Sequence, residues 1–272
     1  MGFRALRFPS WLPAVAILSL LLPQSKAWAW GNEGHRIIAD IAWDHLSKTT
    51  LLNLRPFLGD SDLASISTWP DDIRSGRTGT GPWHYVDIPL NGASYDIKYC
   101  PEDNCVVAQI QKFAHILGDP DQPFAARSEA LKFLVHFVGD LSQPLHAVGD
   151  ARGGNDIPVT AFGSAQCGDY PCNLHGVWDS QLIEHTGLRE HAYTQQLEKV
   201  IAADHLKPGS DDPITWANDS LQLARQAWVQ PQANIDQNYY QRERPVVDRQ
   251  LALAGLRLAR LLNEELGTKA KS

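Results

Sequence analysis

Residues 131–146 read Leu131-Lys-Phe-Leu-Val-His-Phe-Val-Gly-Asp-Leu-Ser-Gln-Pro-Leu-His146. From residue 131 to residue 141 the stretch is apolar almost all the way round a helix, which is the composition of a buried core helix. His136 and Asp140 lie four residues apart within it, so both side chains point to one face. Burying a carboxylate is costly unless the group is paired or bound to a metal. The stretch therefore predicts either a satisfied buried polar pair or a metal site.

The end of this helix is marked by Pro144. Proline has no N–H, and its ring disfavours helical geometry at the preceding residue, Gln143. Another ligand-type residue, His146, comes just past this stop. Two histidines and a carboxylate around the end of a core helix favour the metal-site interpretation.

The first 29 residues have the features of a secretory signal peptide. Arg4 and Arg7 precede an apolar run over residues 11–22, and Ala27-Trp28-Ala29 fits the small-x-small cleavage rule. The run is too short to span a bilayer comfortably, although an uncleaved anchor is the alternative. We expect cleavage before Trp30, a mature domain over residues 30–272, and a secreted or periplasmic protein. No later stretch is long and apolar enough to cross a membrane.

The chain is acidic, with 24 Lys+Arg against 31 Asp+Glu and a formal net charge of −7. Residues 1–29 contain three basic residues and no acidic one, so the mature chain carries −10. Unaided nucleic-acid binding normally needs basic patches, but bound divalent cations would reverse the charge locally. A phosphate substrate is therefore not excluded. The absence of linkers and repeats indicates one domain, and a monomer is the default expectation.

The four cysteines form two close pairs, Cys100 with Cys105 and Cys167 with Cys172. In an oxidising compartment disulfides are expected, and local pairing is the simplest of the three connectivities. A zinc ribbon is the alternative, but its two-residue spacing is absent. We expect each pair to close its own surface loop.

Periodicity indicates a mainly α fold, a single-domain multi-helix bundle with short extended loop segments. Short extended pieces are expected near residues 84–88 and 157–161. Nothing alternates for long enough to build a large sheet. The expected helices cover residues 33–47, 106–117, 131–141, a short segment from about 175, 216–229 and 246–266.

Ligand-type residues recur in four other short segments. The last of them contains His175 and Asp179, a second histidine-carboxylate pair four residues apart on a predicted helix. Such pairs aim imidazole and carboxylate at a common point, and this oxygen and nitrogen set suits zinc. The segments are Trp30-Gly-Asn-Glu-Gly-His35, Trp69-Pro-Asp71, Trp83-His84-Tyr85-Val-Asp87 and Asn173-Leu-His175-Gly-Val-Trp-Asp179.

Taken in order, these segments resemble the motifs of the S1/P1 nucleases, which are secreted enzymes with three zinc ions. The resemblance runs from Trp30 to Asp179 and includes His-x-x-Gly-Asp-x-x-Gln-Pro-Leu-His and Gly-Gly-Asn. It implies a trinuclear zinc cleft. The implied ligands are Asp71, His84, His136 and Asp140 for the first ion, the bridging Asp140 with His35 and the amino group and carbonyl of Trp30 for the second, and His146, His175 and Asp179 for the third.

The chain departs from the family pattern at three places. Tyr85 stands where members often have phenylalanine, and Ser180 follows Asp179 where others carry asparagine. The loop between Asn155 and His175 also carries the Cys167–Cys172 insert, which we expect to reshape the substrate groove.

Substrate contacts are expected from four residues. Arg74, one helical turn after Asp71, would contact phosphate and transition-state charge, the alternative being a solvated surface arginine. Tyr85 and Asp87 would stack on a base and bond its edge, the alternative being a core aromatic and a capping carboxylate. Asn155 would tie its loop near the metals or simply form a turn. Asp71, Asp140 and Arg74 are the expected catalytic set.

The function that this resemblance implies is a zinc-dependent endonuclease. It would act on RNA and DNA, prefer single strands, leave 5′-phosphorylated products and also hydrolyse nucleoside 3′-phosphates. One alternative is a zinc-dependent phospholipase C, where the carboxylate at the place of Asp179 is typically glutamate. Another is a secreted zinc-binding protein without turnover.

Overall fold

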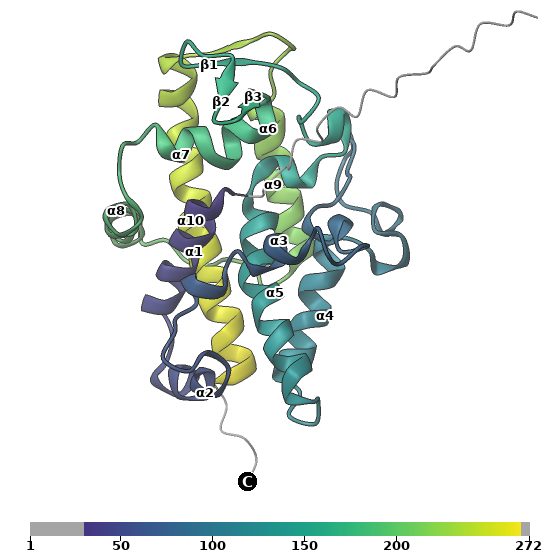
Figure 1. Ribbon diagram of the computed structural model, residues 1–272, viewed down its shortest axis with the longest axis vertical. Coiled ribbons are helices and arrows are strands. Elements are labelled where there is room, and N and C mark those ends of the chain that lie inside the picture. Colours follow the sequence, from purple (N-terminus) through teal and green to yellow (C-terminus); the bar gives the residue numbers. More distant parts are fainter. Residues whose placement is uncertain (1–29, 268–272) are drawn as a thin grey trace, which may run out of the picture.

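The computed structural model describes residues 30–267 and has the core helix, α5 (Phe124–Ser142), at its centre (Figure 1). Every residue from Ala130 to Ser142 except Lys132 is buried. The helix ends at Ser142, because Pro144 disfavours helical geometry at Gln143, whose backbone is extended with ψ of 117°. The predicted buried helix and its stop are confirmed, although the helix begins at Phe124, earlier than the apolar run indicates.

Helices dominate the described residues, and extended structure is confined to two short pairs. Strand β1 (Thr160–Ala161) pairs in parallel with β4 (Asn234–Ile235), and β2 (Gln166–Cys167) pairs antiparallel with β3 (Tyr170–Pro171). The remaining helices are α1 (Asn32–Asp44), α2 (Lys48–Leu58), α3 (Trp69–Ile73), α4 (Val106–Gly118), α6 (Leu174–Gly176), α7 (Leu182–Glu184), α8 (Glu190–Ala203), α9 (Pro213–Ala227) and α10 (Gln237–Leu266). Short 3-10 turns are η1 (Ala64–Ile66), η2 (Gly81–His84), η3 (Ile97–Tyr99), η4 (Pro101–Asp103), η5 (Pro144–Ala147) and η6 (Asp150–Arg152), and η7 (Val177–Gln181) is a π-helix.

Two helix pairs build most of the frame, α4 with α5 and α1 with α10 (Figure 1). Phe113 of α4 stacks on Phe133 of α5 with ring centroids 4.6 Å apart. On the other side, Gly255 of α10 faces Ile41 of α1, where a Cβ would lie 2.5 Å from the Ile41 Cγ2 atom. Glycine is needed there because any side chain would force the two helices apart.

The helix predicted over residues 33–47 is present but ends earlier than expected. α1 ends at Asp44, and the Ser47 hydroxyl accepts a hydrogen bond from the Thr50 N–H at 3.1 Å, which caps the start of α2. Serine is a preferred helix N-cap, so the residue taken as the end of one helix begins the next. Neither α2 nor α8 is among the helices predicted from the sequence.

Two other expectations differ from the structure in detail. α10 begins at Gln237 and continues through Pro245, so the periodic run from residue 246 is only its second part. The segment over residues 84–88 forms no strand, although Tyr85 has an extended backbone. The segment over residues 157–161 does contain β1.

Both predicted disulfides are present, Cys100–Cys105 and Cys167–Cys172. The second one closes the β2–β3 hairpin. Within residues 30–267, no helix combines the length and apolarity needed to span a bilayer. The predicted signal peptide lies outside the described residues.

Candidate metal centre and substrate cavity

Asp140 stands at the point where five of the predicted ligands meet. Its Oδ1 atom lies 3.3 Å from the His35 Nε2 atom. Its Oδ2 atom lies 3.0 Å from the His84 Nδ1 atom and 3.4 Å from the His136 Nε2 atom. The two oxygens of one fully buried carboxylate thus face different histidine nitrogens, one beside Oδ1 and two beside Oδ2. A carboxylate in this position is able to bridge two metal ions.

Asp71 lies beside the same two histidines that the Asp140 Oδ2 atom faces. Its Oδ1 atom lies 3.7 Å from the His84 Nδ1 atom, and its Oδ2 atom lies 3.6 Å from the His136 Nε2 atom. Asp71 belongs to α3. Pro70 immediately precedes it, and its fixed backbone angle suits the first turn of a helix. Residues more than 60 positions apart in the sequence are therefore brought within ligand distance by α3 packing on α5.

A second group lies on α6, η7 and η5. The His175 Nε2 atom is 3.4 Å from the Asp179 Oδ2 atom, and the His146 and His175 rings stack with centroids 5.0 Å apart. Asp179 lies in the π-helical turn η7, a rare geometry that is frequent at functional sites. The ligand-type atoms of His146, His175 and Asp179 all lie within 4.8 Å of one another.

Backbone carbonyls orient three of the imidazole rings. The Nδ1–H groups of His136, His146 and His175 each donate to a carbonyl oxygen at 2.7 Å, the acceptors being Ser67, His84 and Gly153. A carbonyl only accepts, so the proton is on Nδ1 and the Nε2 lone pair faces the carboxylates. Hydrogen bonds of this kind from the outer ring nitrogen are typical of metal-binding histidines.

Two glycines permit close packing around the candidate ligands. A Cβ on Gly139 of α5 would lie 2.9 Å from the His35 Nδ1 atom, so only glycine lets α1 bring His35 against α5. Gly153 has a φ of +63°, and a Cβ there would lie 2.6 Å from the Leu145 carbonyl oxygen. These contacts explain why the sequence motifs contain glycine at these two positions, although glycine has no side chain that could bind a metal.

Gln143 is a site residue to which the sequence analysis assigned no role. Its Nε2 group donates to the Asp179 Oδ1 atom at 2.7 Å, and its Oε1 atom accepts from the Leu145 N–H at 2.6 Å. The side chain is fully buried. It holds Asp179 so that Oδ2 faces His175. The sequence feature that could have identified Gln143 is its position between Asp140 and Pro144 in the quoted motif.

These groups pass a direct test of whether they fit metal ions. Several of their atoms are buried without a hydrogen-bond partner in the described chain, including both Asp140 oxygens and the Nε2 atoms of His35, His146 and His175. Native proteins rarely leave such atoms unsatisfied, so each calls for an explanation such as a bound ion. Cations coordinated by these atoms would satisfy them.

Burial explains the protonation behaviour of the same groups. It raises the pKa of Asp140 and of Asp179 well above the ordinary range, because a buried carboxylate lacks solvation. It lowers the pKa of His175 to about 4, and that of His35 well below its ordinary value. The histidines are therefore neutral and ready to coordinate, whereas the carboxylates need positive charge to stay ionised.

Trp30 begins the described chain inside the protein, with a fully buried side chain. The next N–H, that of Gly31, donates to the Asp179 carbonyl oxygen at 2.6 Å. This bond attaches the start of α1 to the π-helical turn that carries one of the candidate ligands. The expected N-terminal ligand therefore directly precedes a residue that is bonded to this turn.

The expected substrate residues surround the centre at different depths. Arg74 is partly buried, and its Nη1 atom lies 3.8 Å from the Asp71 Oδ1 atom. Burial is the main cause of the lowered pKa values of His84 and His136, and the positive charge of Arg74 also lowers them. Tyr85 is partly buried and Asp87 is exposed. Their segment is attached to η5 by the Val86 N–H, which donates to the His146 carbonyl at 2.8 Å.

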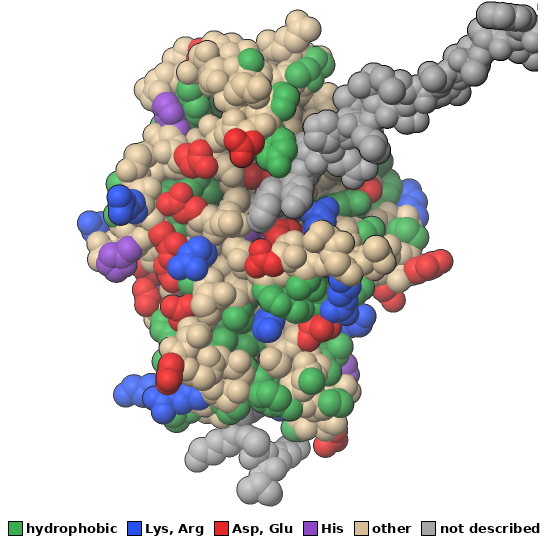
Figure 2. All heavy atoms as spheres, in the orientation of Figure 1, with side chains coloured by type: hydrophobic (Ala, Val, Ile, Leu, Met, Phe, Trp, Pro, Cys, Tyr) green, Lys and Arg blue, Asp and Glu red, His purple; other side chains and the backbone are tan. Residues whose placement is uncertain are grey.

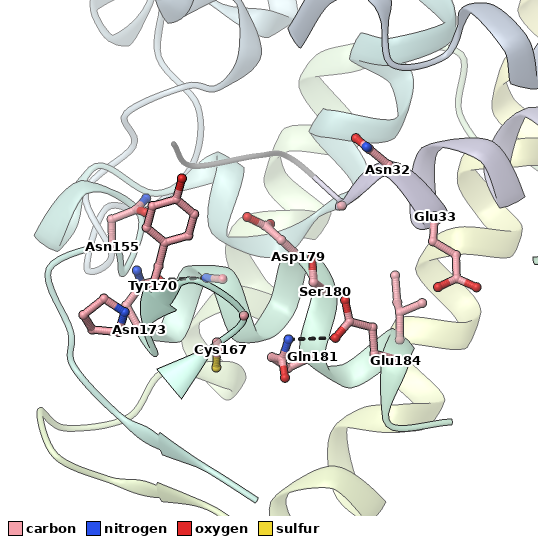
Figure 3. A pocket seen from close by; sticks show the side chains of 16 residues that line it. Asn32, Glu33, Asn155, Cys167, Tyr170, Asn173, Asp179, Ser180, Gln181 and Glu184 are labelled. Atoms are coloured by element: carbon pink, nitrogen blue, oxygen red, sulfur yellow. Dashed lines mark hydrogen bonds between the residues drawn. The ribbon is translucent and has the colours of Figure 1, made fainter. Parts of the chain in front are cut away.

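A cavity of about 470 Å³ opens beside Asp179 (Figure 3). Tyr170 and Asn155 lie on one side of it, and Glu33 and Glu184 on the other. The Cys167–Cys172 hairpin forms part of its wall. The cavity is large enough for a nucleoside-sized group. Asn155 also donates from Nδ2 to the Arg152 carbonyl at 2.8 Å, which fixes the loop.

The fold and the site define a helical protein with adjoining, buried groups of histidine and carboxylate able to hold metal ions. A sequence model of the S1/P1 nuclease family matches residues 30–267. Endonuclease 4 of Arabidopsis thaliana is 31% identical over 96% of each chain. Nuclease S1 of Aspergillus oryzae is 29% identical over 94% of this chain and 97% of its own length. Nuclease P1 of Penicillium citrinum is 28% identical, covering 88% and 99% respectively.

The chain belongs to the S1/P1 nuclease family. It is accordingly a hydrolase that acts on the phosphodiester bonds of nucleic acids. S1/P1 nucleases depend on metal ions, and the buried histidine and carboxylate groups are where this chain is able to hold them. The phospholipase and non-catalytic alternatives are not supported by this match.

Proposed function

We propose that this protein is a secreted zinc endonuclease that cleaves single-stranded RNA and DNA, leaves 5′-phosphorylated ends and removes phosphate from nucleoside 3′-phosphates. The observation that carries the proposal is Asp140, whose two buried oxygens face different histidine nitrogens. A structural zinc site is usually closed and mononuclear, and it has no use for such a bridge.

Three zinc ions are proposed. Asp140 would be shared by the first two ions, and the purely nitrogen and oxygen ligands suit zinc. When bound, the ions would supply Lewis acidity toward the phosphate and would acidify water. They would also add positive charge where this acidic chain must accept the scissile phosphate. The ligand sets are Asp71, His84, His136 and Asp140; Asp140, His35 and the Trp30 amine and carbonyl; and His146, His175 and Asp179.

The protein's own residues would position the substrate. Arg74 would bind the phosphate oxygens by charge-assisted hydrogen bonds, since its guanidinium already lies beside the Asp71 carboxylate. Tyr85 would stack on one base, and Asp87 would accept a hydrogen bond from its edge. The cavity beside Asp179 would hold the nucleoside on the other side of the scissile bond. A base must leave its stack to enter, which accounts for single-strand preference.

We expect Arg74→Ala to lower kcat for single-stranded DNA roughly 100-fold, because removing one preformed donor to developing charge typically has that effect. The Michaelis constant should change less. Steady-state kinetics measures both, and Arg74→Lys should recover part of the rate. Metal content must be measured in the same samples. An unchanged kcat with full metal content would mean that Arg74 only neutralises Asp71.

We expect Tyr85→Ala to raise the Michaelis constant for dinucleotides roughly tenfold and to lower kcat less, because base stacking on an aromatic ring contributes about 1–3 kcal/mol. Tyr85→Phe keeps the ring and is the matched control, so its constant should stay near that of the unmodified enzyme. Equal Michaelis constants for all three proteins would assign Tyr85 to packing alone.

Maturation is part of the proposal. Cleavage before Trp30 would free an α-amine with a pKa near 8, which is able to lose its proton and bind zinc. The mature domain would then comprise residues 30–272 and act as a monomer in the periplasm or outside the cell.

Hydrolysis of heat-denatured DNA by the matured protein, with and without a chelator, tests the proposed function. Phosphatidylcholine is assayed in parallel, and the ends of the DNA products are analysed. Chelator-sensitive release of 5′-phosphorylated products with intact lipid is the expected result. Cleavage of the lipid in place of DNA would contradict it, and so would 3′-phosphorylated products.

A further inference from the structure

A group of basic and aromatic side chains covers part of α3, η2, α4 and α5, and we call it the basic-aromatic band. The Lys132 ammonium lies 4.7 Å from the centre of the Trp69 ring. The Lys112 ammonium lies 5.4 Å from the centre of the Trp83 ring, and the Arg77 guanidinium lies 5.9 Å from the same ring. Both indoles are only partly buried, so the band belongs to the surface. Figure 2 shows basic and hydrophobic side chains side by side over α4 and α5.

The band begins at the candidate metal centre. Trp69 is two residues before Asp71, and Trp83 immediately precedes His84. Phe133 of the core helix fixes both indoles, packing edge-on with ring centroids 5.4 Å and 5.5 Å away. The positions of the two indoles relative to the candidate ligands are therefore set by the core.

The charge of the band is opposite to that of the whole chain, which has a formal net charge of −7. Arg77 is partly neutralised by Glu129, with a distance of 2.9 Å between Nη1 and Oε2. Within the described residues, Lys112 and Lys132 have no carboxylate at ion-pair distance, and their contacts are with aromatic rings. Their charges are therefore available to an anionic partner. Over α1, by contrast, the same view shows mainly acidic side chains (Figure 2).

We infer that the basic-aromatic band binds the part of a single-stranded nucleic acid that extends beyond the cleaved nucleotide. Cations that lie beside aromatic rings suit a flexible polyanion that carries bases, because phosphates pair with the cations and bases contact the rings. This inference rests on the proposed nuclease function. It adds a binding track for long substrates, which a dinucleotide is too short to occupy.

The test uses the double variant Lys112→Ala/Lys132→Ala as the metal-loaded enzyme. Its charge-matched control is Lys48→Ala/Lys199→Ala, which removes two exposed lysines from α2 and α8. For each protein, kcat/KM is measured on a single-stranded 20-mer and on a dinucleotide at several salt concentrations. Melting temperatures of both variants verify that they are folded.

The expected result is a selective effect on the long substrate. The band variant should lose roughly fivefold in kcat/KM on the 20-mer at low salt, as expected for two charge contacts at the surface. The slope of log kcat/KM against log salt should become shallower by about 1.4, because each phosphate contact to a single strand contributes about 0.7. Dinucleotide hydrolysis should not change, and the control variant should behave as the unmodified enzyme.

Two results would overturn the inference. One is an unchanged salt slope on the 20-mer, and the other is an equal loss for the control variant, which would reflect net charge alone. An equal loss on both substrates would also contradict it, because the lysines would then act at the centre. Failure of the unmodified, metal-loaded enzyme to cleave either substrate would instead contradict the proposed function.

Discussion

Asp140→Asn is expected to lower kcat/KM for single-stranded DNA by about 10⁴-fold, the loss typical of removing one member of a catalytic group that acts as a unit. The variant keeps the size of the side chain but replaces a charged carboxylate by a neutral amide with only one acceptor oxygen. The Asp140 oxygens face His35 on one side and His84 and His136 on the other, so the amide cannot serve both sets. Metal analysis should show the loss of at least one ion per chain.

The melting temperature of the metal-free variant distinguishes a catalytic role of Asp140 from a role in folding. Burial raises the pKa of Asp140, so above the ordinary pKa of a carboxyl group the metal-free native state must protonate the group or bury its charge. Asparagine avoids this cost. After chelation, Asp140→Asn should therefore melt no lower than the unmodified protein.

Asp121→Asn, in the exposed turn between α4 and α5, is the matched control and should keep activity and metal. Full activity of Asp140→Asn with an unchanged metal content would contradict the role of Asp140 as a bridge. A large loss of melting temperature in the metal-free variant would assign the residue a purely structural role.

Retention of a single residue before Trp30 is expected to lower kcat/KM at least roughly 100-fold, the scale of losing one interaction that supports a metal. An amide nitrogen does not replace an amine as a ligand, because it does not readily lose its proton. The structure gives the chain little freedom to adapt, since Trp30 is buried and Gly31 is hydrogen-bonded to the Asp179 carbonyl.

The comparison needs two preparations that differ only in their first residue, one beginning at Ala29 and one at Trp30, each verified by intact mass. Zinc content and hydrolysis of a dinucleotide are measured for both. Equal rates and equal zinc content would exclude the amine as a ligand. A form that begins at Gly31 should be at least as impaired as the extended form.

Local spacing made much of the candidate site predictable. A histidine and a carboxylate four residues apart on a helix share a face in any fold, which is why His136 with Asp140 and His175 with Asp179 could be paired from the sequence. The proximity of Asp71 on α3 to His136 on α5 does not follow from local spacing, because only tertiary packing brings the two residues together. Without the family resemblance, the sequence offered no physical argument for joining them.

Several features had only weak signals in the sequence. The π-helical turn η7 contains Asp179 in a segment that looks like an ordinary helix start. α8 buries only four of its 14 residues, so the apolar stripe along it is sparse. Gln143 stood in a quoted motif, but a glutamine before proline has many roles, and only the bond to Asp179 identifies this one.

Zinc analysis of the matured protein tests the central claim most directly, because the proposed chemistry depends on three ions held by Asp140 and its neighbours. Inductively coupled plasma mass spectrometry on protein that begins at Trp30 should give three zinc ions per chain, with activity lost on chelation and restored by zinc. Full nuclease activity in protein that contains less than one metal ion per chain would contradict the account.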